Sequence, residues 1–160
     1  MRVYTIKDFD TFDRDGDGRI LCPSGDYTNI VVFPAFCTFG ERCRFGKDCI
    51  FGERCHFGEG CSFGEWCSFG ECCTFGEQCK IENGKEMRDM LKFEGFGREK
   101  RATYFFLLSD REIFVRCGCF SGYLDEFRKQ VRETHGTSRH AEDYLAIAGI
   151  AERHWEGAVQ

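Results

Sequence analysis

The chain has 160 residues, 42% of them hydrophobic and 31% charged, with a formal net charge of −5 and 12 cysteines. This length is sufficient for one or two small domains with cores of their own. No apolar run approaches a membrane span and the N-terminus lacks the apolar core of a signal peptide, so we expect a cytoplasmic protein with no membrane partner. Thiols stay reduced in such a compartment, which argues against a disulfide scaffold.

Residues 1–24 are predicted to form an N-terminal cap followed by a turn rich in Asp and Gly. Thr5 and Asp8 have the spacing of a helix N-capping pair, and Phe9 and Phe12 give the short helix an apolar edge. We expect this helix to cover one open end of the repeat region that follows.

The turn matches the first eight positions of an EF-hand loop. Its candidate calcium ligands are Asp13, Asp15 and Asp17. The twelfth position is Ser24, where such a loop requires a bidentate Glu. A solvated turn without calcium is therefore the alternative interpretation.

Residues 25–84 carry a six-residue repeat, Cys-x-Phe-Gly-Glu-x. Its cysteines are Cys37, Cys43, Cys49, Cys55, Cys61, Cys67, Cys73 and Cys79. Each is followed two residues later by Phe, or by Ile81 in the last unit. Residues two apart in an extended segment point to the same side, so we expect Cys and Phe to face inward and the sharp turn to fall at Gly. Three such segments would close a coil of about 18 residues.

The pattern resembles the hexapeptide repeat of left-handed parallel β-helices, although Phe and Cys replace the usual aliphatic and small residues. The resemblance implies a mainly β fold with a short left-handed parallel β-helix of about three coils. That fold often trimerises, so a homo-oligomer, either a dimer or a trimer, is expected. Some members of the family are acyltransferases that use a His as general base, and His56 is the one His in the repeats that could serve.

The net charge lies wholly in residues 1–84, which carry 14 acidic and 9 basic side chains, whereas residues 85–160 carry 13 of each. Residues 18 apart are expected to stack, which would align the outward Glu side chains in columns. The Glu residues that we expect at an interface are Glu59, Glu65, Glu71 and Glu77. An acidic surface repels nucleic acid and can imitate it, so we expect a protein partner.

Two apolar residues occupy outward positions of the repeat, Ile50 and Trp66. An outward Trp is either chance or an interface anchor, since aromatic residues are enriched among the residues that dominate binding. We take both residues as candidate interface positions.

Residues 85–160 are predicted to form an α+β domain with a β-hairpin and two helices. The predicted strands are Met90–Phe96, Ala102–Leu108 and Glu112–Cys117, and the predicted helices are Ser121–His135 and Ser138–Trp155. The segments 116–127 and 133–136 resemble a tail domain of small uncharacterised proteins of phages and prophages. That resemblance implies a genomic setting and no chemistry.

Four side chains of this domain have the ligand types that suit zinc: Cys117, Cys119, His135 and His140. The Cys-x-Cys spacing is tighter than that of most zinc sites, and a purely structural role is the alternative.

Together these features predict a non-enzymatic binding or inhibitor protein of phage or mobile-element origin that needs no cofactor. Its acidic β-helix would engage a host protein, for example a nucleic-acid-binding component of a defence system. An acyltransferase-like enzyme and a structural assembly module are the alternatives.

Overall fold

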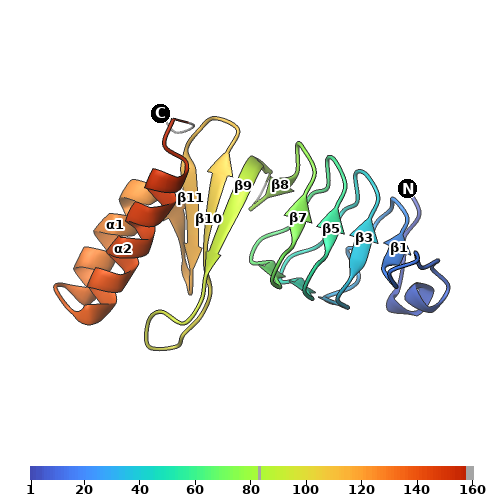
Figure 1. The fold of residues 1–160 in the computed structure, drawn as a ribbon, viewed down its shortest axis with the longest axis horizontal. Coiled ribbons are helices and arrows are strands. Elements are labelled where there is room, and N and C mark those ends of the chain that lie inside the picture. Colours follow the sequence, from blue (N-terminus) through green and yellow to red (C-terminus); the bar gives the residue numbers. More distant parts are fainter. Residues whose placement is uncertain (83, 158–160) are drawn as a thin grey trace. The chain divides into compact units, whose positions relative to one another are not determined.

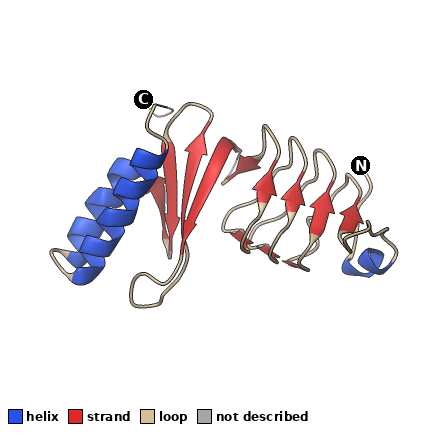
Figure 2. Ribbon diagram, in the orientation of Figure 1, coloured by secondary structure: helices blue, strands red, loops and turns tan. Residues whose placement is uncertain are grey.

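The computed structural model of the chain describes residues 1–82 and 84–157 and is mainly β with two α-helices, which confirms the predicted class (Figure 1, Figure 2). It divides into two compact units, Met1–Met87 and Arg88–Gln160. We call them the coil unit and the tail unit. The predicted boundary falls between residues 84 and 85.

Three parallel ladders run along the coil unit. The first is a sheet of β1 (Ile20–Cys22), β3 (Cys37–Phe39), β5 (His56–Phe57) and β7 (Thr74–Phe75), in that order. The second consists of β2 (Val32–Phe33), β4 (Ile50–Phe51) and β6 (Ser68–Phe69). The third is a series of single bridges through Asp26, Arg44, Ser62 and Lys80.

The register of these ladders sets the size of one turn of the coil. His56 pairs with Thr74, 18 residues further on, and Val32 pairs with Ile50 in the same way. Figure 1 shows β1, β3, β5 and β7 following one another in a regular row. Three hexapeptides therefore make one turn, one on each ladder.

The glycine after each Phe is required because adjacent turns approach closely. A Cβ on Gly70 would lie 2.5 Å from the backbone nitrogen of Glu53, and one on Gly64 would lie 2.6 Å from that of Lys47. Their φ angles are not positive, so the expectation that the chain turns sharply at these glycines is wrong.

The left-handed backbone falls two residues later, directly before each Cys. The residues there are Phe36, Arg42, Asp48, Arg54, Gly60, Trp66, Cys72 and Gln78, with φ between 55° and 73°. A left-handed non-Gly residue costs roughly 1–2 kcal/mol. This cost is offset by a backbone hydrogen bond to the next turn. The Arg42 N–H, for example, donates to the Glu59 carbonyl at 2.8 Å.

Aromatic rings fill the interior of the coil in three columns. The columns are Tyr27, Phe45 and Phe63; Phe33, Phe51 and Phe69; and Phe39, Phe57 and Phe75. Within a column the rings stack nearly parallel, as Phe39 on Phe57 at 5.3 Å and 2°. Between columns they meet edge to face, as Phe51 and Phe57 do at 4.9 Å and 85°. Both geometries are favourable for aromatic quadrupoles.

The repeat cysteines are free thiols that face inward as predicted, and all but the half-buried Cys73 are buried. Several donate to a glycine carbonyl of the preceding turn, as Cys61 does to Gly40 and Cys67 to Gly46, each at 3.3 Å. Cys72, beside Cys73 in the sequence, occupies an outward corner and is exposed. The thiols thus serve as small core residues with a weak donor.

Both ends of the coil are partly covered. At the N-terminal end, Tyr4 stacks on Tyr27 at 5.0 Å and Phe9 packs 6.0 Å from Phe33. The short helix η1 (Ile6–Asp10) follows Thr5, whose N–H donates to the Asp8 carboxylate. At the other end, β8 (Lys80–Ile81) pairs antiparallel with the first residues of β9 (Lys85–Phe93). These contacts cover part of each end of the coil, while β6 and β7 remain the last strands of their sheets.

In the tail unit, β10 (Thr103–Leu108), β11 (Ile113–Cys117) and β12 (Phe120–Tyr123) form an antiparallel sheet, with β9 beside β10. Helices α1 (Leu124–His135) and α2 (Arg139–His154) lie together on one face of that sheet (Figure 2). The core between helices and sheet includes Phe105, Val115, Phe127, Ile147 and Ala148.

Two predicted elements of this unit are displaced in the structure. The first strand occupies Lys85–Phe93 and not Met90–Phe96, because its start pairs with β8, a contact that its mixed polar sequence does not indicate. Residues Phe120–Tyr123 form β12 and not the start of a helix, because they pair with β11 and α1 begins only at Leu124. The second helix begins after Ser138 as predicted, and the Ser138 hydroxyl accepts from the Ala141 N–H.

Candidate functional site

The outward residues of the coil differ in character from one side to the next. Because the interior is filled with aromatic rings, a partner can reach only the outer surface. On the side formed by β2, β4 and β6, the middle residues are Val32, Ile50 and Ser68, which pair in register. Val32 is 61% exposed and Ile50 is 51% exposed. We call this the apolar side.

The apolar side continues into a hollow at the N-terminal end of the coil. This hollow, of about 390 Å³, is lined by residues that include Ile6, Val31 and Val32. Ile6 and Val31 are each about half exposed. Isolated apolar residues on a surface are ordinary, but a contiguous group of this kind marks an interaction site more often than chance.

Acidic side chains border the apolar side along one edge. Glu53 and Glu71, both exposed, follow β4 and β6 directly at the corner and lie one turn apart. On the opposite edge, before β4 and β6, lie the exposed Asp48 and the half-buried Trp66. The Trp66 backbone N–H donates to a Glu82 carboxylate oxygen at 3.3 Å. Two of the predicted interface residues, Ile50 and Trp66, thus belong to one side of the coil.

The four predicted interface glutamates lie on three different corners. Glu59 and Glu77 are exposed and follow β5 and β7, in the same column as Glu41. Glu65 is half-buried and lies in the same column as Lys47, a residue of opposite charge. Glu71, with Glu53, and Glu65, with Trp66, lie at the two corners that flank the apolar side, whereas Glu59 and Glu77 lie at the third corner.

His56 lies away from the apolar side, on the sheet of β1, β3, β5 and β7. It is half-buried and its Nδ1 pairs with the Thr74 hydroxyl of the next turn. Burial, and next the nearby charge of Arg19, lower the pKa of His56. The imidazole is therefore neutral near pH 7, as a general base must be, but it lines neither the hollow at the N-terminal end of the coil nor the cavity of the tail unit.

The Asp-rich loop is organised by its own hydrogen bonds. The Asp15 carboxylate accepts from the backbone N–H groups of Asp17 and Arg19, both at 2.9 Å. The Asp13 carbonyl accepts from the Leu21 N–H. Within residues 1–82 and 84–157, no three His, Cys, Asp or Glu side chains gather as metal ligands.

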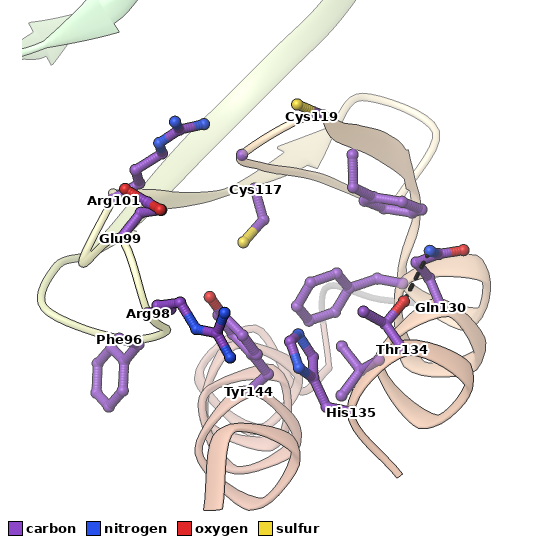
Figure 3. A pocket seen from close by; sticks show the side chains of 14 residues that line it. Phe96, Arg98, Glu99, Arg101, Cys117, Cys119, Gln130, Thr134, His135 and Tyr144 are labelled. Carbon is purple, nitrogen blue, oxygen red and sulfur yellow. Dashed lines mark hydrogen bonds between the residues drawn. The ribbon is translucent and has the colours of Figure 1, made fainter. Parts of the chain in front are cut away.

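Three of the four proposed zinc ligands line one cavity of the tail unit, of about 290 Å³: Cys117, Cys119 and His135. Figure 3 shows the Cys117 sulfur directed into this cavity and the Cys119 sulfur directed away from it. The His140 ring lies 5.8 Å from the His135 ring but does not line the cavity. The cavity also contains Tyr144 and Arg98, which the sequence did not indicate because neither belongs to a motif.

None of the helices in the described part of the chain is long and apolar enough to cross a membrane. Comparison with protein-family models, with curated proteins and with solved structures gave no match.

Proposed function

We propose that the protein is a non-enzymatic binding protein of phage or mobile-element origin that docks on a host protein and inhibits it. In this proposal the coil has the left-handed geometry of hexapeptide-repeat proteins, and its apolar side is the contact surface. The observation that carries the proposal is the exposed pair Val32 and Ile50, each more than half exposed, beside the acidic pair Glu53 and Glu71.

The chemistry of this surface favours a basic partner. The coil region carries the whole net charge of −5, and two acidic side chains border the apolar side without an intervening Lys or Arg in their column. Complementary charge raises the association rate and selects the partner, while buried apolar anchors slow dissociation. A basic, nucleic-acid-binding host protein whose positively charged surface has an apolar centre would match both the acidic border and the apolar side.

The rigidity of the coil also supports binding. Val32 and Ile50 sit on strands whose inward neighbours Phe33 and Phe51 stack at 4.7 Å. Because this backbone is already rigid, it loses little conformational freedom when a partner docks. The entropic cost of association is therefore small. The same regularity spaces Glu53 and Glu71 one turn apart.

The proposal is tested by affinity capture from a bacterial host lysate with Ile50→Lys and a matched control, Leu21→Lys. Leu21 is also an exposed aliphatic residue in the middle of a strand, 40% exposed, but it lies on β1. We expect a basic protein to be retained by the wild type and by Leu21→Lys, and to be lost with Ile50→Lys.

Sedimentation of the same three proteins without lysate distinguishes the assembly alternative. If the wild type self-associates and Ile50→Lys alone is monomeric, the apolar side is occupied by a second copy. That result would replace the binding proposal with an assembly module.

A further inference from the structure

The cavity of the tail unit gathers polar groups that the proposed binding function does not use. Its wall combines the buried apolar residues Phe127 and Val131 with the polar residues His135 and Tyr144. A concave, mainly apolar site with a few convergent polar groups is the usual form of a small-molecule site. Its volume of about 290 Å³ is just below the range that is usual for drug-sized ligands, about 300–1,000 Å³, and therefore suits a smaller ligand.

Cys117 stands at the wall of the cavity, where a buried hydroxyl group contacts its sulfur. The fully buried Thr103, its partner in the β10–β11 ladder, donates from Oγ1 to Cys117 Sγ at 3.2 Å. Tyr144 lines the same cavity, and burial followed by the proximity of Cys117 raises the pKa of Tyr144 to about 12. Tyr144 is thus a neutral hydrogen-bond donor throughout the physiological range.

The loop between β9 and β10 covers the Tyr144 hydroxyl. Gly97, with φ +79°, lies directly against the Tyr144 hydroxyl, and a Cβ at this position would collide with it. A glycine is needed here for both reasons, the left-handed backbone and the close approach. The next residue, Arg98, is thereby placed at the mouth of the cavity.

Arg98 is the cation of the site. Figure 3 shows its guanidinium group directed toward Tyr144 and His135, whereas the Arg101 side chain points away from the cavity. Glu99, the one carboxylate in the lining, lies beside Arg101 in the same view. The His135 ring lies 5.6 Å from the Tyr144 ring, so an imidazole, a phenol and a guanidinium face the same space.

We propose that this cavity binds a small organic carboxylate with an aromatic or short aliphatic group. Arg98 pairs with the carboxylate, because a guanidinium matches carboxylate geometry with two parallel hydrogen bonds. Phe127 and Val131 contact the apolar group. The Cys117 sulfur lies within reach of the bound molecule. The Cys119 sulfur is directed away from the cavity and lies out of reach.

The test uses alkylation of Cys117 as the readout, with each cysteine resolved by peptide mass spectrometry. Native full-length protein is treated with iodoacetate, which carries a carboxylate, or with the neutral iodoacetamide. In either reaction the cysteine sulfur attacks the methylene carbon, iodide leaves and the thiol proton passes to the buffer. The measured quantity is the ratio of the two rates at Cys117.

We expect Arg98→Gln to lower this ratio about tenfold, the equivalent of one charge-assisted hydrogen bond. Arg101→Gln, which makes the same change in net charge, should leave it within about twofold of the wild type, as should the ratio at Cys119 in every protein. An unchanged ratio at Cys117 in Arg98→Gln would overturn the proposal.

A second measurement needs no variant. Millimolar phenylacetate should slow the reaction of wild-type Cys117 with iodoacetamide, and the neutral phenylacetamide should protect much less. Absence of protection by phenylacetate, or equal protection by both compounds, would contradict a carboxylate site even if Arg98→Gln proved unstable.

Discussion

The coil unit and the tail unit build their cores in opposite ways. In the coil the same contact recurs at each turn: Phe39 stacks on Phe57 and Phe57 on Phe75, at 5.3 and 5.2 Å. In the tail each core residue has a different neighbour, as Phe105 packs edge to face on both Phe93 and Phe127. Repetition fills the interior and leaves function to the outer surface, whereas the irregular tail retains a cavity of about 290 Å³.

The largest loss of stability is expected when an aromatic ring is removed from the middle of the coil. Phe57 contacts rings above, below and on both sides, so Phe57→Ala should lower the free energy of unfolding by about 3–5 kcal/mol. Phe75, in the last turn, is only half-buried, and Phe75→Ala should cost clearly less. Urea unfolding measures both. Equal losses, or a loss below about 1 kcal/mol at Phe57, would be inconsistent with stacked turns.

The loss of stability on replacing a glycine should depend on its position in the repeat. Gly64→Ala places a Cβ 2.6 Å from the Lys47 backbone nitrogen, which should destabilise the coil by about 1–3 kcal/mol. Gly60 has φ +73°, yet the equivalent corners elsewhere hold Arg, Asp, Trp, Cys and Gln. Gly60→Asn should therefore be within about 1 kcal/mol of the wild type. Thermal melts of both variants measure the two losses of stability. A larger loss for Gly60→Asn than for Gly64→Ala would show that the left-handed turn is assigned to the wrong residue.

High pH should weaken the coil through its thiols. The hydrogen bond with Cys43, aided by burial, raises the pKa of Cys61 to about 12, and the bond with Cys37 raises that of Cys55 to about 11. In the unfolded chain these thiols ionise near pH 8.5, so the folded form binds more protons above that pH. Their contribution is complete below about pH 8.5 and is lost as the pH rises through 11 and 12.

We expect the free energy of unfolding to fall by about 1 kcal/mol or more between about pH 8 and 10.5. Urea titrations across this range measure it, and Cys61→Ala should show a shallower fall than the wild type. A stability that does not change with pH in this range would contradict the protonated state of Cys55 and Cys61 in the folded chain.

The sequence predicts much more of the coil than of the tail, for a physical reason. A strict period of six fixes which residues face inward, so the inward Cys and Phe are correctly predicted and Tyr27 takes the same slot. The role of the glycines was misjudged, because sequence alone does not distinguish a positive φ from the close approach of a neighbouring backbone. Gly70 illustrates the second case.

In the tail, the cavity could not be predicted because Arg98, Cys117 and Tyr144 come from a loop, a strand and a helix. Nothing local relates them, and they meet only through tertiary packing. Of the candidate interface residues, Ile50, Trp66, Glu65 and Glu71 lie on or beside one side of the coil, whereas Glu59 and Glu77 lie at the remaining corner. Val32 is not among the predicted interface residues, although it occupies the outward slot equivalent to that of Ile50.

The central claim is that one side of the coil, and not its overall charge, recognises the partner. It is tested most directly by the association rate at low salt of two double variants, Glu53→Lys with Glu71→Lys and Glu41→Lys with Glu59→Lys. Both change the net charge equally and both replace exposed glutamates one turn apart, but only the first pair borders the apolar side. We expect association with the captured host protein to slow by about tenfold or more for the first pair and by much less for the second. Equal slowing would contradict the account, because it would mean that net charge alone governs binding.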